Sequence, residues 1–190
     1  MLKIRNAVLV LGSVVMLLSG ACAAPKVDFS QIKQPPRATE LEAFNPFVGS
    51  WTWDAKLDNA DGPDADWSGT AVWKWSLDNR CLVGDIFSKS SRAEFKATGI
   101  WSWHPTKKRY MWWMFNNWGF PQDGSATYDA AAKSWNMNYT SVGLDGTTSH
   151  GQYRMKVVDD NTLSWEMTEW TGVLHMIEKM TMRGTYHRQK

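Results

Sequence analysis

Apolar residues recur at every second position in short segments along most of this chain, and this period-two pattern constrains the fold more than any other feature. It is clearest where Phe95, Trp101 and Trp103 fall on one face while Lys96 and Ser102 fall on the other. Successive side chains of a β-strand point to opposite sides, so this alternation indicates a strand with one buried face. Because no convincing amphipathic helix separates these segments, the pattern predicts an all-β chain.

Turn-forming residues separate the alternating segments at short, regular intervals. Asp78-Asn79, Asp123-Gly124 and Asp145-Gly146 are typical of hairpin turns. An up-and-down sheet that closes on itself has no exposed edge and can enclose a ligand. We therefore expect about ten strands in an antiparallel up-and-down barrel. The expected strands are 51–57, 67–75, 81–88, 95–103, 110–115, 125–128, 135–139, 153–157, 163–168 and 173–186.

The N-terminal segment has the organisation of a secretory signal peptide. Lys3 and Arg5 precede the apolar run 7–18, and small residues follow that run. The run is shorter than the roughly 20 apolar residues that a membrane-spanning helix needs. We therefore expect residues 1–22 to be a signal peptide and the protein to be exported.

Two processing sites fit this segment, and they lead to different mature proteins. Cleavage after Ala23 follows the A-x-A pattern and gives a soluble periplasmic protein. Cleavage before Cys22 would leave a lipidated cysteine as the first residue of an outer-membrane lipoprotein, although Ser19 stands where a lipobox usually has leucine. Residues 23–40 contain prolines and little periodicity, so we expect a flexible tether there, followed by a barrel domain over 41–190.

Processing also changes the charge and the cysteine content. Loss of Lys3 and Arg5 with the signal peptide lowers the basic count from 21 to 19, which equals the 19 acidic residues. A formal net charge of zero argues against nucleic acid as a partner. Cys81 is the cysteine of the expected barrel domain, so that domain has no internal disulfide, and we expect Cys81 to be a small buried residue. We expect a monomer that contacts a membrane only through a lipid anchor.

Two short motifs lie at opposite ends of the expected barrel. A Gly-x-Trp motif ending at Trp51 opens the first strand, after a possible helical turn at 41–44 that Pro46 stops, and Arg183 lies in the last strand. This pairing resembles the lipocalin-like (calycin) barrels. The resemblance implies that Trp51 and Arg183 close one end of the barrel and are structural. An arginine over an indole face contributes about 1 kcal/mol.

A wider set of motifs resembles the bacterial family known as domain of unknown function 1579. The resemblance covers about residues 41–190 and implies the barrel fold without an activity. Nitrobindin-like haem proteins share the ten-strand plan, but 49–55 reads GSWTWDA and lacks the glycines of their G-x-W-x-G-x-G motif, which argues against haem. The motifs that resemble the domain of unknown function 1579 family are FVGSW at 47–51, FKATGIW at 95–101, GSATYD at 124–129 and TMRGTY at 181–186.

Tryptophan is unusually frequent, with 13 residues in the chain. Flat indole rings with an N–H donor suit a small hydrophobic or aromatic ligand in the lumen. The alternative is that large rings simply fill a wide barrel, which would make this a ligand-free structural protein of the envelope. Trp112 and Trp113 point to opposite faces, so only one of them can line the lumen. The expected lumen residues are Trp73, Trp101, Trp103, Trp112, Trp135, Tyr153, Trp165 and Glu178.

Three acids stand at positions that alternate with apolar residues, namely Asp85, Glu169 and Glu178. Acids that face the lumen would support an alternative function as an isomerase or hydrolase, whereas a bulge that shifts the register would turn them to solvent. His175 is the alternative axial ligand for haem. The sequence has no nucleophile motif or metal-ligand spacing, so we predict no catalytic residue, metal or cofactor and favour a binding protein over an enzyme.

Overall fold

The computed structural model describes residues 30, 33–58, 60–143, 145–171 and 177–190, with the side chains of 177–179 excepted. The expected signal peptide, Cys22 and His175 lie outside this part of the chain, as does the Glu178 side chain. Residues Pro36–Lys190 form one compact unit. It contains the whole of the expected barrel domain.

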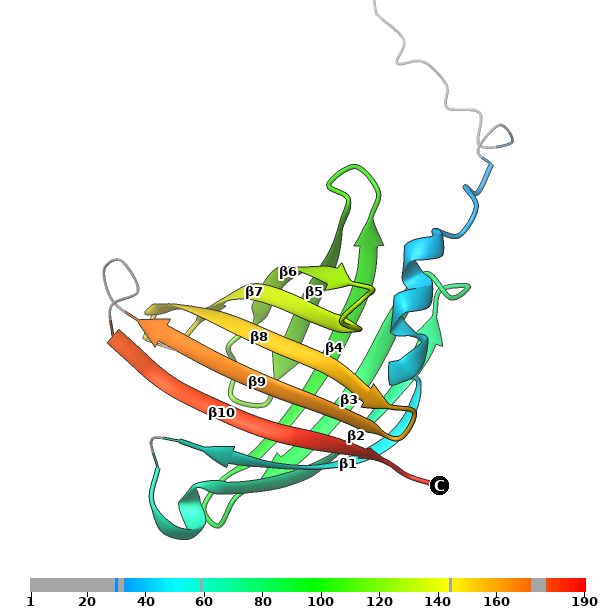
Figure 1. Cartoon of the computed structure of the whole chain (residues 1–190). Coiled ribbons are helices and arrows are strands. Elements are labelled where there is room, and N and C mark those ends of the chain that lie inside the picture. The colour runs from blue at the N-terminus through cyan, green and yellow to red at the C-terminus, as the bar shows by residue number, and fades with distance from the viewer. Residues whose placement is uncertain (1–29, 31–32, 59, 144, 172–176) are drawn as a thin grey trace, which may run out of the picture. The chain divides into compact units, whose positions relative to one another are not determined.

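Ten antiparallel strands close into a barrel, which confirms the predicted fold (Figure 1). Around the barrel each strand pairs with its neighbours in sequence, and the first pairs with the last, so the order is up-and-down throughout. The strands are β1 (Gly49–Leu57), β2 (Asp66–Ser76), β3 (Cys81–Lys89), β4 (Glu94–His104), β5 (Arg109–Asn116), β6 (Gln122–Asp129), β7 (Ser134–Val142), β8 (Thr148–Asp159), β9 (Thr162–Thr171) and β10 (Ile177–Arg188).

The alternation of the sequence appears directly as alternating burial. On β1, Trp51, Trp53 and Ala55 are buried, whereas Thr52 and Asp54 between them are exposed. The inward residues form one continuous apolar core around the lumen. The pleat of each strand therefore sorts the side chains as its sequence predicts.

Strand boundaries differ from the prediction where a glycine lies inside a strand. The sequence places a turn at Asp123-Gly124, but both residues belong to β6, and Gly124 pairs with Tyr139 of β7. Likewise β8 begins at Thr148, before Gly151, rather than near Tyr153. Glycine resembles a turn signal in sequence, yet here it lies in a strand beside an aromatic neighbour.

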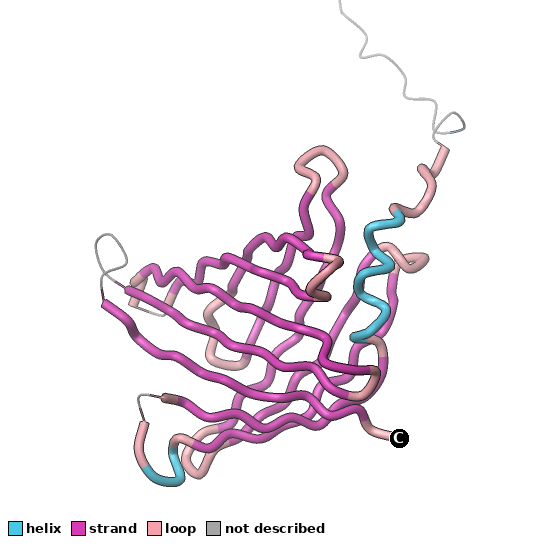
Figure 2. Tube along the Cα trace, in the orientation of Figure 1, coloured by secondary structure: helices cyan, strands magenta, loops and turns pink. Residues whose placement is uncertain are grey.

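A short helix covers one end of the barrel. Helix η2 (Thr39–Phe47) is a 3₁₀ helix that buries Leu41, Phe44 and Phe47 and contains Pro46, so it is longer than the predicted turn at 41–44 (Figure 2). A second short 3₁₀ helix, η3 (Gly62–Asp64), forms one turn between β1 and β2. Among the described residues, no helix has the length and apolar character needed to cross a membrane.

Arg188, rather than Arg183, closes this end of the barrel. Its guanidinium carbon lies 4.2 Å from the ring centroid of Trp51, its cross-strand partner. The two terminal nitrogens donate to the carbonyls of Val48 and Pro46, at 2.6 and 2.7 Å. Arg188 therefore joins β1, β10 and the chain that leaves η2.

The predicted closing role of Arg183 is wrong because the strand register places it elsewhere. Arg183 pairs with Lys56, five positions along β1 from Trp51, and its side chain is exposed. On the outer surface it forms ion pairs with Asp58 and Glu166. The last strand holds two arginines on opposite faces, and its pairing with β1 places Arg188 beside Trp51.

Candidate functional site

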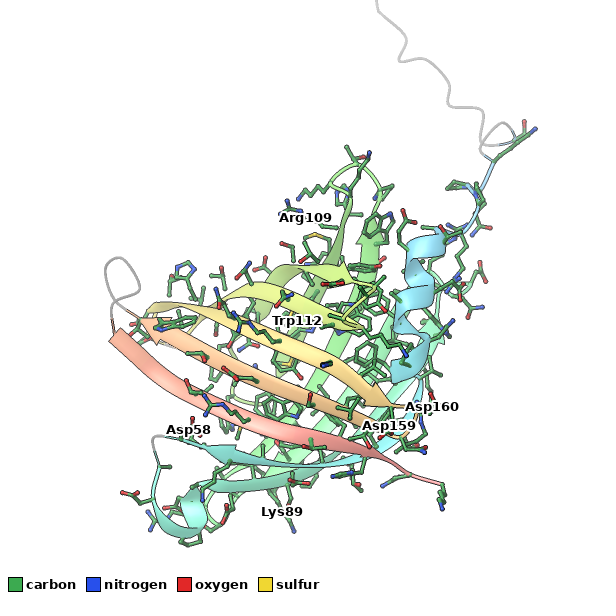
Figure 3. The ribbon with its side chains drawn as sticks, in the orientation of Figure 1. Asp58, Lys89, Arg109, Trp112, Asp159 and Asp160 are labelled. Atoms are coloured by element: carbon green, nitrogen blue, oxygen red, sulfur yellow. The ribbon has the colours of Figure 1, made fainter. Side chains whose placement is uncertain are left out.

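The barrel encloses a cavity of about 290 Å³ that is lined almost entirely by apolar side chains. Trp112, labelled in Figure 3, is buried inside the barrel, whereas the labelled Lys89, Asp159 and Asp160 are exposed. Trp113 points away from the lumen and is 37% exposed. The residues predicted from the sequence that line the cavity are Trp73, Trp101, Trp112, Trp135, Tyr153 and Trp165.

Trp103 was also predicted to line the lumen. The structure describes its side chain, which does not line the cavity. It is half-buried near the end of β4, where its ring packs edge-on against Tyr110 at a centroid distance of 4.9 Å. The Tyr110 hydroxyl in turn donates to the carbonyl of Glu40 in η2, at 2.9 Å. Helix η2 covers this end of the barrel. The cavity therefore ends at the helix, and Trp103 lies beyond that end. The Glu178 side chain lies outside the described part of the chain.

The rings line the wall without filling the lumen because glycines lie opposite them. Gly84 is the cross-strand partner of Trp73, and a Cβ built on Gly84 would lie only 2.1 Å from Cε3 of that ring. The ring therefore occupies the space of the missing side chain and lies across the neighbouring strand. The cross-strand pairs with this arrangement are Trp53–Gly69, Trp73–Gly84, Tyr139–Gly151 and Trp165–Gly184.

A second group of rings lies at the end of the cavity away from η2. Trp118, in the connection between β5 and β6, is 39% exposed, and its indole N–H donates to the carbonyl of Glu94 at 3.0 Å. Its ring contacts Phe95 at 5.1 Å and Trp67 at 6.4 Å between centroids. The Phe120 ring also contacts Trp118, at 5.8 Å between centroids. This partly exposed group borders the cavity, and we take it as the mouth.

Several indole N–H groups of the cavity wall have no hydrogen-bond partner among the described residues. They belong to Trp53, Trp67, Trp135 and Trp165, all of which line the cavity. Trp51 differs, since its indole donates to the Phe47 carbonyl at 2.7 Å. Buried donors normally find an acceptor, because leaving one unpaired costs about 1–3 kcal/mol. The wall therefore offers donors that a bound molecule could satisfy.

Glu169 places a carboxylate in this apolar lumen. It is 4% exposed and lines the cavity from β9, as one sequence alternative predicted. The Tyr139 hydroxyl donates to its Oε2 at 3.1 Å. Gly151 pairs with both residues across β8, and its lack of a side chain lets the Tyr139 ring cross that strand.

Buried tyrosines of the lumen are held in their protonated form. Burial raises the pKa of Tyr139, and the charge of Glu169 raises it further. Burial raises the pKa of Tyr153 well above its ordinary value, and the neighbouring Tyr186 hydroxyl raises it further. Burial also raises the pKa of Tyr186 to about 12, although the Tyr153 hydroxyl lowers it in part. These hydroxyls are hydrogen-bond donors at neutral pH.

Asp85 does not enter the lumen, which corrects the alternative that placed it there. It is exposed on the outer face of β3, where it accepts a hydrogen bond from Thr98 Oγ1 at 2.9 Å. Asp85 shares its face of β3 with Val83 and Phe87, but all three lie on the outer side, opposite Leu82. Both faces of β3 carry apolar residues, so apolar alternation alone did not identify the inner one.

The other described side chains that could bind a metal or react lie apart from one another. No three His, Cys, Asp or Glu side chains of the described residues converge on a common point. Cys81 is buried, with its Sγ 3.8 Å from the Ser76 carbonyl. The register between β9 and β10 shifts between Glu178 and Met180, in the region where the sequence allowed for a bulge.

Sequence reasoning missed several wall residues, among them Tyr139, Trp53 and Trp67. The alternation itself could have found them. Tyr139 shares a face with Trp135 on β7, and Trp53 shares a face with Trp51 on β1. What the sequence did not show was that Tyr139 would reach Glu169, two strands away.

Comparison with known proteins shows the fold and no more. No family model and no curated protein matches the chain. The crystal structure of Rv2717c from M. tuberculosis is similar to 82% of this chain over its own full length, with a TM-score of 0.59 and 14% identity. The S-type phycobiliprotein lyase CPES from Guillardia theta is similar over 81% of this chain and 94% of its own, with a TM-score of 0.53 and 10% identity. These likenesses support the expected β-barrel fold.

Proposed function

We propose that this protein binds a small hydrophobic or aromatic molecule in the lumen of its barrel. The observation that carries the proposal is a ring-lined cavity of about 290 Å³ with buried indole donors that lack a partner among the described residues. Its volume is close to the lower end of the roughly 300–1,000 Å³ typical of ligand pockets, so the ligand is small. The donors of Trp53 and Trp165 favour a ligand with a hydrogen-bond acceptor.

The alternatives have less support. A barrel filled by its own rings, as a ligand-free structural protein requires, would not contain a cavity of this size. An isomerase or hydrolase needs at least two reactive groups around one space, but Asp85 lies on the outer face. Glu169 is the one acid among the described residues that line the cavity.

The proposal includes the cellular setting that the sequence indicates. The basic start, the apolar run 7–18 and the small residues after it support export by a signal peptide. Cys22 supports a lipid anchor, with a soluble periplasmic form as the alternative. Membership of the domain of unknown function 1579 family, a monomeric state and the absence of a cofactor also belong to the proposal.

Fluorescence titration with prodan, an uncharged naphthyl ketone, tests lumen binding. We expect a blue-shifted emission and a Kd on the order of micromolar. Gln122 lines the cavity at the first residue of β6, so Gln122→Trp should block it and weaken binding by about tenfold or more. Thr127→Trp is the matched control, because Thr127 is exposed on the same strand.

The two variants separate lumen binding from surface binding. Circular dichroism would first establish that both retain the barrel. Equal prodan affinity in Gln122→Trp and Thr127→Trp would place the dye outside the lumen and contradict the proposal. Haem, included in the same panel because of the His175 alternative, should produce no Soret shift.

A further inference from the structure

Four aromatic side chains that carry hydrogen-bond donors meet on one side of the lumen. They line the cavity from four adjacent strands and are Trp53 of β1, Tyr186 of β10, Trp165 of β9 and Tyr153 of β8. Trp53 and Tyr186 are cross-strand partners with ring centroids 6.0 Å apart. The Trp165 ring lies over Gly184 of β10 and contacts the Trp53 ring, at 5.7 Å between centroids. Pairing of β1 with β10 therefore assembles this group.

The two tyrosine hydroxyls of the group are neighbours. Tyr153 stacks on Trp165, with 5.7 Å between centroids and 26° between the ring planes, and its hydroxyl interacts with that of Tyr186. Among the described residues, neither hydroxyl has a hydrogen-bond partner besides the other tyrosine. Two phenols carry two protons, and a bond between them uses only one. At least one O–H of the pair therefore remains available to a bound molecule.

Donors outnumber acceptors in this part of the wall. The indole N–H groups of Trp53 and Trp165 have no partner among the described residues, and an indole offers no acceptor in return. Burial raises the pKa of Tyr153 and of Tyr186, so both phenols stay protonated at neutral pH. An acceptor on a bound molecule would satisfy donors that the protein itself leaves unpaired.

A carbonyl oxygen on a flat conjugated body has the properties that this group requires. Its two lone pairs accept from two donors at once, and its flat body stacks on indole and phenol rings. A carboxylate would also accept, but none of the described residues that line the cavity is Lys, Arg or His. Because burial of an ionised group without a cationic partner is costly, the group favours an uncharged acceptor.

We propose that the lumen selects uncharged aromatic or conjugated carbonyl compounds, with the carbonyl oxygen on the hydroxyls of Tyr153 and Tyr186 and the flat body against Trp165. This inference rests on the proposed function, because it requires that the lumen binds a ligand. It adds the functional group of that ligand and the residues that recognise it.

The infrared carbonyl band of a bound ketone tests the inference on the unmodified full-length chain. The ligand is 2-acetylnaphthalene, and the difference between its spectra with and without an isotope label in the carbonyl cancels the protein bands. A hydrogen bond weakens the C=O bond, so we expect the bound band to lie below its position in hexane. A bound band at the hexane position would show an unbonded carbonyl and overturn the inference.

Two further ligands with the same naphthyl body separate the acceptor from the body. In 2-isopropenylnaphthalene a methylene group replaces the carbonyl oxygen, and in 2-naphthoate a carboxylate replaces the methyl ketone. Displacement of bound prodan gives the affinity of each. We expect the ketone to bind about tenfold more tightly than the naphthoate, because the lumen supplies no cation to the carboxylate. Tighter binding of the naphthoate would overturn the inference, since the preferred acceptor would then be an anion.

Substitution identifies the recognising hydroxyls. The double variant Tyr153→Phe, Tyr186→Phe keeps both rings but removes both donors. The ketone should lose about tenfold in affinity, while 2-isopropenylnaphthalene should bind within about twofold of its original affinity. Tyr128→Phe is the matched control, since Tyr128 is half-buried on β6 and does not line the cavity. An unchanged ketone affinity in the double variant, or equal losses for both ligands, would overturn the inference.

The outcomes separate this inference from the proposed function. If prodan binds in the lumen but the ketone band lies at its hexane position, or if the naphthoate binds more tightly, only the carbonyl inference fails. The same holds if prodan binds and none of the three naphthyl ligands displaces it. If prodan does not bind and the ketone gives no bound band, the proposed function itself fails. If the double variant does not fold, the band position and the naphthoate comparison in the unmodified protein still decide.

Discussion

At the scale of single residues, the open lumen depends on glycines placed opposite aromatic rings. Trp73 lies over Gly84, and Tyr139 lies over Gly151, each on the directly paired residue of the next strand. A glycine in a strand normally weakens it, because it has no side chain to pack. Here the neighbouring ring supplies that packing, and the space in the centre stays open.

We predict that Gly84→Ala destabilises the barrel by about 1–3 kcal/mol, the usual cost of overpacking a core. The new Cβ would lie 2.1 Å from Trp73 and would push the ring into the lumen. Gly99→Ala is the control, because its nearest neighbour is the far edge of the same ring at 3.3 Å. Urea unfolding should show a clearly larger loss for Gly84→Ala, and equal losses would contradict the arrangement.

At the scale of elements, η2 and the two terminal strands are joined by one side chain. Arg188 stacks on Trp51 of β1 and donates to the carbonyls of Pro46 and Val48, where the chain leaves η2. Phe44 and Phe47 of η2 pack against lumen rings such as Trp101 and Trp135. The helix is thus part of the cavity wall, and the attachment of its C-terminal end determines how firmly that end is closed.

We predict that Arg188→Ala lowers the free energy of unfolding by about 2–3 kcal/mol, since the carbonyls of Pro46, Val48 and Asp160 lose charge-assisted hydrogen bonds and the Trp51 indole loses its stacked cation. Arg183→Ala should leave the unfolding midpoint nearly unchanged, because Arg183 forms its ion pairs on the exposed surface. Denaturant unfolding of both variants checks this. A larger loss of stability for Arg183→Ala than for Arg188→Ala would indicate that Arg183 closes the barrel.

At the scale of the whole molecule, closing ten strands around one lumen buries several tyrosine hydroxyls. Burial raises the pKa of Tyr110 and of Tyr186 to about 12, and raises those of Tyr139 and Tyr153 as well. In the unfolded chain a tyrosine ionises near pH 10. The folded barrel therefore binds these protons more tightly than the unfolded chain does.

We predict alkaline destabilisation from this difference. Stability should be complete below about pH 10 and should fall as the pH rises through about 12, because only the unfolded chain then gains from ionising its tyrosines. Tyr186→Phe should reduce the total fall by roughly 2–3 kcal/mol. Urea midpoints measured between about pH 8 and 12 check this, and a midpoint that stays constant over that range would contradict it.

Much of the wall was predictable because a strand's two faces are set locally. The positions of Trp73, Trp101 and Trp112 in the lumen follow from period-two alternation and needed no partner strand. Trp103 has the same alternation but lies outside the cavity lining, because the place where η2 covers the lumen depends on a distant part of the chain. The hydrogen bond from Tyr139 to Glu169 likewise depends on the register of β7 with β8 and on that of β8 with β9. It also depends on Gly151 of β8, which lies between the two residues.

The sequence by itself determined the all-β class, the antiparallel up-and-down order and the faces of most strands, because these follow from short-range alternation and turn chemistry. Only the tertiary structure decided that Asp85 faces outward, that Arg188 closes the barrel, and that the lumen is hollow with the Glu169 carboxylate inside. Each of these depends on the register between strands and on closure of the sheet. Those are long-range properties that a period-two pattern does not contain.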